Sequence, residues 1–265
     1  MPTKERILYG GKIKMEFVEE RHMYRVNGRT GILSATGVTG TINKPALMFW
    51  SVKMMKESLL EFFANNDKYS DEQLIIAIDE ASKAHTKKKD KEATSGSLVH
   101  KFAEDYINFQ LKVTKEKPSI PKDERVANGA LAFLRWVEEH KIKFLASELL
   151  VYSKKHDYAG LMDCKFTMGT EKHEIIHCGD FKTSSGVWDE YLFQVAGYQE
   201  ADAEESKDEY GDAYILRLDK DSGEFEAHII PTKDHKKNFK AFYGVLLTKK
   251  RLRELENKKK AWMKK

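Results

Sequence analysis

The spacing of apolar and polar residues along the chain predicts a protein that mixes helices with strands. Helical spacing, with apolar residues three or four positions apart, runs through residues 46–64, 71–91, 95–111, 123–140, 188–204 and 233–257. Alternating or continuous apolar runs predict strands near 144–152, 158–168, 173–183, 212–219 and 223–230. Residues 12–26 alternate as a β-hairpin does, and Asn27-Gly28 adds a turn signal. This order predicts an α/β fold with a mixed central β-sheet flanked by helices and a helical N-terminal part.

The length of 265 residues suits one enlarged domain with a sizeable core. We expect a single domain, 1–265, in which 1–95 form an N-terminal hairpin and helical elaboration, 96–230 the core, and 231–265 a C-terminal helix and basic tail. The sequence has no internal repeat, no apolar leader and no apolar run of membrane length. We therefore expect a soluble protein without a membrane partner.

Two cysteines bear on the cellular compartment. Cys164 and Cys178 lie on neighbouring predicted strands, but the alternation of side chains turns them to opposite faces. Neither a disulfide nor a shared zinc site is expected, and His173 and His177 are explained as solvent-facing strand residues. A reducing cytoplasm is the natural location for such a chain.

Charged residues make up 33% of the chain, but the net charge of +4 is small for a protein that would hold a polyanion. Their local placement carries more information. Residues 83–91 and 249–265 are rich in lysine, whereas residues 202–212 are acidic. Basic stretches raise the affinity for phosphates, although a solvated helix face or a disordered tail would also explain both runs.

Candidate chemistry is concentrated between residues 158 and 183. Asp163 lies on the more polar face of one predicted strand, and Asp180 and Lys182 lie at the end of the next. Side chains in a strand alternate with period two, so Asp180 and Lys182 project to the same face. If the two strands pair as a hairpin, the two aspartates approach each other, and a bound cation would relieve their repulsion. The pattern therefore suggests a divalent-metal site that cuts a phosphodiester, whereas an isolated Asp-x-Lys more often marks an exposed edge strand.

Two predicted helices carry further polar groups. His100 and Glu104 lie four residues apart, on one face of the 95–111 helix. Gln194 and Tyr198 share a stripe of the 188–204 helix with Tyr191, and an amide and a phenol can both contact phosphate. Each feature taken alone has an ordinary explanation, because single histidines and apolar stripes are common in helices that only pack.

Together and in this order, the motifs resemble a known enzyme superfamily. They are Gly96-x-x-x-His100, Glu148 in Ser-Glu-Leu-Leu-Val-Tyr, Gly160-x-x-Asp163, Asp180-x-Lys182-Thr183 and Gln194-x-x-x-Tyr198. The set is similar to the RecB-type branch of the PD-(D/E)XK nucleases, and the stretch from Ser34 to Trp50 is similar to phage-encoded exonucleases of that branch. The resemblance runs from about Ser34 to Tyr198. The iron–sulfur members of the branch use four cysteines, whereas this chain has two.

The resemblance implies a restriction-endonuclease-like core and a metal-dependent deoxyribonuclease. The ligands of Mg²⁺ or Mn²⁺ would be His100, Asp163, Asp180 and the backbone carbonyl of Phe181. Lys182 would orient or activate the attacking water, and Glu148 matches a catalytic position whose role stays open. The residues expected to contact nucleic acid are Gln194, Tyr198, Thr183, Ser184 and Lys44.

The same resemblance favours an exonuclease that acts on linear DNA with free ends, in phage recombination, replication or DNA processing. A single-strand annealing protein is an expected partner, and the host cytoplasm is the expected location if the chain is phage-encoded. An endonuclease or nickase on the same fold, or a non-catalytic DNA-binding protein that kept the fold, remain alternatives at this point. The presence of Asp163, Asp180 and Lys182 favours the enzyme.

Overall fold

A computed structural model describes residues 3–169, 174–184, 186–218 and 224–263. The chain forms two compact units, one made of residues 1–42 and 99–265 and the other of residues 43–98. The first unit contains the sheets, and the second is helical. The units divide at residues 42/43 and 98/99, so the expected N-terminal segment 1–95 is shared between them, and its strands belong to the unit that holds the core.

The central sheet of the first unit has six strands and mixes both directions, as predicted. Its strands are β4 (Leu33–Ser34), β5 (Ile142–Ser153), β6 (Tyr158–Met168), β7 (Ile176–Lys182), β8 (Tyr210–Leu218) and β9 (Phe225–Ile230). The order is β4-β6-β7-β8-β9, with β5 also paired to β6. The pairs β4–β6 and β7–β8 are parallel, and the others are antiparallel. The predicted hairpin of the strands that carry Asp163 and Asp180 is therefore present as β6–β7.

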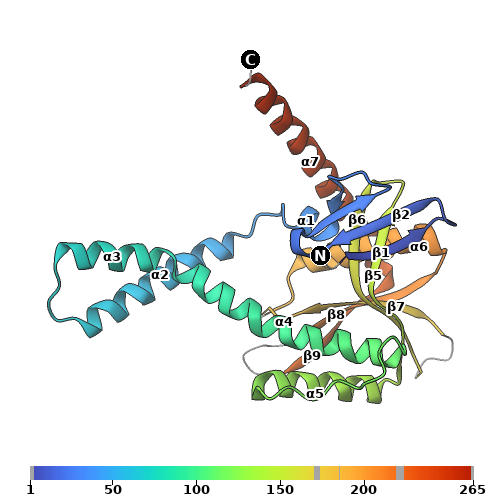
Figure 1. Cartoon of the computed structure of the whole chain (residues 1–265), viewed down its shortest axis with the longest axis horizontal. Coiled ribbons are helices and arrows are strands. Elements are labelled where there is room, and N and C mark those ends of the chain that lie inside the picture. Colours follow the sequence, from blue (N-terminus) through green and yellow to red (C-terminus); the bar gives the residue numbers. More distant parts are fainter. Residues whose placement is uncertain (1–2, 170–173, 185, 219–223, 264–265) are drawn as a thin grey trace. The chain divides into compact units, whose positions relative to one another are not determined.

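Helices cover both faces of this sheet (Figure 1). The C-terminal half of α4 (Ala84–Gln110) and α5 (Glu124–Glu139) pack on one face around Phe133 and Phe166. On the other face, α1 (Ala35–Thr39), α6 (Asp189–Ser206) and α7 (His235–Trp262) pack around Tyr158 and Phe242. α5 begins where the Asp123 carboxylate accepts the backbone N–H groups of the first turn, as expected of an N-cap. The buried stripe along α5 then fixes which of its sides meets the sheet.

A second, three-stranded sheet precedes the core, in the order β1-β2-β3. It consists of β1 (Thr3–Leu8), β2 (Ile13–Val18) and β3 (Met23–Val26), with the short helix η1 (Glu19–Arg21) between the last two. The predicted turn at Asn27-Gly28 is present, and both residues have positive φ, as a tight turn requires. The apolar face of this sheet packs against β5 and β6.

The second unit contains α2 (Pro45–Asn65), α3 (Asp71–Ser82) and the first half of α4. Pro45 occupies the first helical position of α2, and Ser70 and Gln73 form a capping box at the start of α3. The predicted boundary between the helices 71–91 and 95–111 is wrong. The helix is interrupted at Lys83, and α4 then runs without interruption from Ala84 to Gln110. Helical periodicity exists on both sides of the break, so the pattern could not locate it. α7 is preceded by the short helix η2 (Thr232–Asp234).

Cys164 and Cys178 are free and buried, and they belong to the clusters on opposite faces of the sheet, as predicted. The prediction of a solvent-facing His177 is wrong. His177 is buried, and its Nδ1 lies 2.8 Å from the Asp212 carbonyl oxygen. His173 lies outside the described residues. Within the described part of the chain, no helix combines the length and the apolar character needed to cross a membrane.

Candidate metal centre

The centre forms where β6 and β7 separate. The two strands pair only at Cys164–Phe166 and His177–Gly179. Beyond this ladder the Asp163 side chain takes the place of a backbone partner, and its Oδ2 accepts the Phe181 N–H at 2.6 Å. This charge-assisted hydrogen bond restrains both the Asp163 side chain and the end of β7, because the backbone N–H has to be paired.

His100 reaches the same point from α4. Its Nε2 lies 3.3 Å from Asp163 Oδ2, and its ring packs edge-on against Phe181, with ring centroids 5.5 Å apart. Glu148, from β5, completes the group. One ligand atom from each of His100, Glu148 and Asp163 lies within 4.8 Å of the others. An imidazole and two carboxylates at this spacing are a donor set that a divalent cation can use.

Asp180 and Lys182 lie beside this group at the end of β7. Asp180 is only 1% exposed and forms an ion pair with the Lys182 ammonium. Its Oδ1 lies 3.3 Å from the Gln194 amide nitrogen, and its Oδ2 is the oxygen that pairs with the Lys182 ammonium. The Lys182 ammonium also lies over the Tyr191 ring, 5.0 Å from its centroid. The predicted same-face placement of Asp180 and Lys182 is therefore confirmed.

Burial and mutual charge shift the pKa values of these groups. Burial would lower the pKa of His100, but the Asp163 carboxylate outweighs it and raises that pKa to about 9. Burial would raise the pKa of Asp163, but the facing His100 lowers it. Burial raises the pKa of Asp180 to about 6 against the opposing effect of Lys182, and burial and Asp163 together raise the pKa of Glu148. For both Asp180 and Glu148 burial is the largest cause of the raised pKa, and the nearby Asp163 carboxylate adds to it.

Glu148 has an unusual backbone. Its φ of 48° lies in the left-handed region, which is rare for a residue with a side chain inside a strand. The β5–β6 register also shifts between Phe144 and Ala146, a few residues earlier. The strand therefore departs from regular alternation just where Glu148 turns toward Asp163. Local strain of this kind is retained where the surrounding structure imposes it.

Gln194 and Tyr198 are buried on α6 and direct their polar atoms into the protein. The Gln194 amide nitrogen lies 2.8 Å from the Tyr198 hydroxyl, and that hydroxyl lies 3.3 Å from Thr36 Oγ1. The Tyr198 ring packs directly on Gly160, where a Cβ would lie 2.5 Å from a ring carbon. The glycine of the Gly160-x-x-Asp163 motif therefore lets α6 approach β6 closely. The chain gathers these groups to support Asp180, and the nucleic-acid contact expected of them stays a prediction.

The other predicted contact residues are placed differently. Thr183 and Ser184 follow Lys182 and are half-buried, with Ser184 donating to the Gly186 carbonyl at 2.7 Å and accepting from Tyr191 at 3.2 Å. Lys44 is exposed and belongs to the second compact unit. Among the predicted site residues, the structure thus brings His100, Glu148, Asp163, Asp180, Lys182 and Gln194 into one neighbourhood, all in the first unit.

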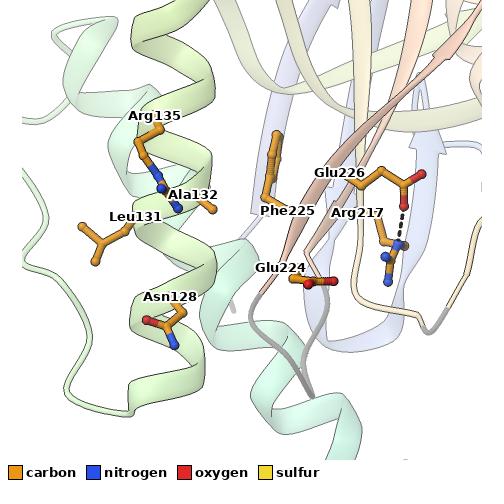
Figure 2. A pocket seen from close by; sticks show the side chains of 8 residues that line it. All are labelled: Asn128, Leu131, Ala132, Arg135, Arg217, Glu224, Phe225 and Glu226. Atoms are coloured by element: carbon orange, nitrogen blue, oxygen red, sulfur yellow. Dashed lines mark hydrogen bonds and ion pairs between the residues drawn. The ribbon is translucent and has the colours of Figure 1, made fainter.

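A cavity lies elsewhere in the first unit, between α5 and the β8–β9 edge (Figure 2). Its volume is about 880 Å³, and its lining includes Arg135, Arg217 and Glu226. Arg217 Nε donates to Glu226 Oε2 at 2.9 Å, so this guanidinium is already paired. None of the lining residues was a predicted site residue, although Arg217 is the β8 neighbour of Lys182 in the sheet.

Two residues that contact this neighbourhood are not among the expected site residues. Lys4 of β1 lies 3.0 Å from Glu148, and Thr36 of α1 contacts Tyr198 as described above. No sequence signal marks Lys4, because an isolated lysine near a terminus is ordinary and its partner lies 144 positions away. Thr36 lies in a stretch of small hydroxylic residues, which is the only signal that could have drawn attention to it.

No protein-family model matches the sequence, and no curated protein matches it. The functional argument therefore depends on the side-chain arrangement itself. Three donors converge on one point, a buried Asp–Lys pair lies beside them, and both sets are held where two strands of a mixed sheet separate.

Proposed function

We propose that the chain is a divalent-metal-dependent deoxyribonuclease of the PD-(D/E)XK type that degrades linear DNA from its ends. The observation that carries the proposal is the convergence of His100, Glu148 and Asp163 beside the buried Asp180–Lys182 pair. This combination unites potential metal ligands with a cationic group that cannot itself be a ligand. Hydrolysis of a phosphodiester can use both, because a metal site and a separate positive charge can act on different oxygens of the phosphate.

The donor set suits a borderline divalent cation such as Mn²⁺, and also Mg²⁺. His100 offers a nitrogen ligand, and Glu148 and Asp163 offer hard oxygens within 4.8 Å. A cation held there would polarise the scissile phosphate and lower the pKa of a bound water.

The chain's own residues would position the rest of the reaction. Lys182 keeps its ammonium between the Asp180 carboxylate and the Tyr191 ring, so its charge is already oriented before substrate arrives. From there it would hold the attacking water and stabilise the charge that develops on the phosphate. Gln194 orients the Asp180 carboxylate by its hydrogen bond to Oδ1. The preference for DNA ends rests on the similarity of Ser34 to Trp50 to phage-encoded exonucleases.

The proposal is tested with an end-labelled linear duplex, a linear single strand and a covalently closed plasmid at one enzyme concentration. We expect the linear substrates to be degraded progressively in Mg²⁺ and at least as fast in Mn²⁺, while the closed circle survives. Ca²⁺ should support DNA binding without cleavage, because it is larger and holds its ligands less strictly. Full activity in excess EDTA would refute the metal-dependent mechanism, and nicking of the closed circle at a comparable rate would favour the endonuclease.

Substitutions separate ligand from catalyst. Asp163→Asn and Asp180→Asn should each weaken Mn²⁺ binding in calorimetry and abolish cleavage. Lys182→Ala should retain Mn²⁺ and DNA binding and lose turnover. Lys143→Ala is the matched control, because Lys143 forms an exposed ion pair with Glu174 at 3.0 Å outside this centre. Loss of the ion in Lys182→Ala would make Lys182 a structural residue instead.

A further inference from the structure

Lys4 places a positive charge inside the acidic side of the centre. Its Nζ lies 3.0 Å from Glu148 Oε2, 3.5 Å from Glu104 Oε1 and 4.0 Å from Glu19 Oε1. The three carboxylates come from β5, α4 and η1, and the lysine comes from β1. An ammonium surrounded by three carboxylates from three separate elements occupies the kind of oxygen-rich position that a divalent cation would take.

The surroundings keep this ammonium charged. Burial would lower the pKa of Lys4, but the Glu148 and Glu104 carboxylates outweigh it and raise the pKa. Lys4 also contacts one of the candidate metal ligands, Glu148, which forms a group with His100 and Asp163. Two-metal nucleases place their ions about 3.5–4 Å apart, with a carboxylate shared between them. Glu148 is the carboxylate that two such ions could share, and its Oε2 atom already accepts a hydrogen bond from the Lys4 ammonium.

We propose that the Lys4 ammonium takes the place of a second divalent cation, so that this centre binds one ion. This inference rests on the metal centre proposed above and specifies how many ions it holds. The Lys4 ammonium neutralises Glu148 Oε2 and shares Glu104 with Lys101, and these two carboxylates would otherwise be the ligands of a second ion. A single positive charge in that position holds Glu148 in place and repels a further divalent cation.

The test counts Mn²⁺ bound to the full-length protein, by electron paramagnetic resonance of the free ion and by calorimetry. We expect one Mn²⁺ for the wild type, and two for Lys4→Met, which keeps the length of the side chain and removes its charge. Lys4→Arg restores a cation and should return the count to one. Lys14→Met is the matched control, because Lys14 bridges Glu5 and Glu16 at 3.0 and 3.1 Å in the same small sheet, away from the centre, and should leave the count at one.

The outcomes separate this inference from the proposed function. If the wild type binds no Mn²⁺, the metal centre itself is wrong. If the wild type binds two ions, or if Lys4→Met still binds one with unchanged affinity, the role of Lys4 is refuted while the metal centre stands. Thermal unfolding of each variant verifies that it is folded, and Lys4→Gln provides a second neutral side chain in case Lys4→Met does not fold.

Discussion

The contact between Gly160 and Tyr198 gives the sharpest test of how the fold builds the centre. A Cβ at residue 160 would lie 2.5 and 2.7 Å from two ring carbons of Tyr198 and 3.2 Å from a methyl of Val151. The ring has little freedom to withdraw, because its hydroxyl contacts the Gln194 amide at 2.8 Å and Thr36 at 3.3 Å. Gly160→Ala must therefore push α6 away from β6 or break these polar contacts.

The magnitude follows from overpacking. Inserting a methyl into a filled site costs about 1–3 kcal/mol. In a protein of this size each kcal/mol corresponds to roughly 2–4 °C, so we expect the melting temperature to fall by roughly 2–12 °C. Adding Tyr198→Leu to Gly160→Ala should recover part of the loss, since the smaller side chain vacates the space that the methyl needs.

Urea denaturation of the single and double variants measures this coupling. Gly244→Ala is the control, because Gly244 lies within α7 with nothing within 4 Å of its missing Cβ. That change should stabilise the protein by about 0.5–1 kcal/mol, as alanine is the better helix former. If Gly160→Ala unfolds at the same urea concentration as the wild type, or if its loss and that of Tyr198→Leu simply add, the close approach of α6 to β6 is wrong.

Two further predictions concern ion pairs outside the centre. Lys165 is buried with its ammonium 2.6 Å from Asp202 Oδ2, and the Arg6 guanidinium and the Tyr210 hydroxyl also contact this carboxylate, at 3.5 and 2.7 Å. Lys165→Ala removes the nearest cation and should lower the free energy of unfolding in urea by about 1.5–3 kcal/mol, the value of a hydrogen bond to a charged group; an effect below about 1 kcal/mol would contradict this. The Arg29 guanidinium lowers the pKa of Asp157. A lowered folded-state pKa stabilises the protein above the unfolded value of about 3.9 and loses that effect as the pH falls through the folded value. The stability difference between wild type and Asp157→Asn should therefore be constant near neutral pH and shrink below about pH 4, and a difference that grows on acidification would be the wrong sign.

The large elements could be predicted because their own residues specify them. α5 combines an N-cap aspartate with a buried stripe, and β6 and β7 are long runs of strand-forming residues. β1 and β4 were missed for the opposite reason. β1 alternates exposed and half-buried residues with only Leu8 fully buried, and β4 is two residues long and depends on parallel pairing with β6. Elements that exist through their neighbours leave little trace in their own sequence.

The same distinction applies to the site. Period-two alternation was enough to place Asp180 and Lys182 together, because both lie on one regular strand and no partner is needed. It was not enough for Glu148. The shifted register near Phe144 and the positive φ of Glu148 interrupt the alternation of β5, so counting positions along that strand does not give the direction of this side chain.

The environment of Glu148 explains why its role could not be read from its motif. Its carboxylate lies close to the His100–Asp163 pair and also contacts the Lys4 ammonium. His100 and Asp163 belong to the predicted motifs, but Lys4 lies on β1, a strand that the sequence did not predict. A glutamate that contacts only the His100–Asp163 pair would be free to bind two ions, whereas one that also holds an ammonium is already half-neutralised. In the one-ion proposal the number of metal ions depends on the N-terminal sheet, so the Mn²⁺ count in Lys4→Met tests a property of the fold as well as of the site.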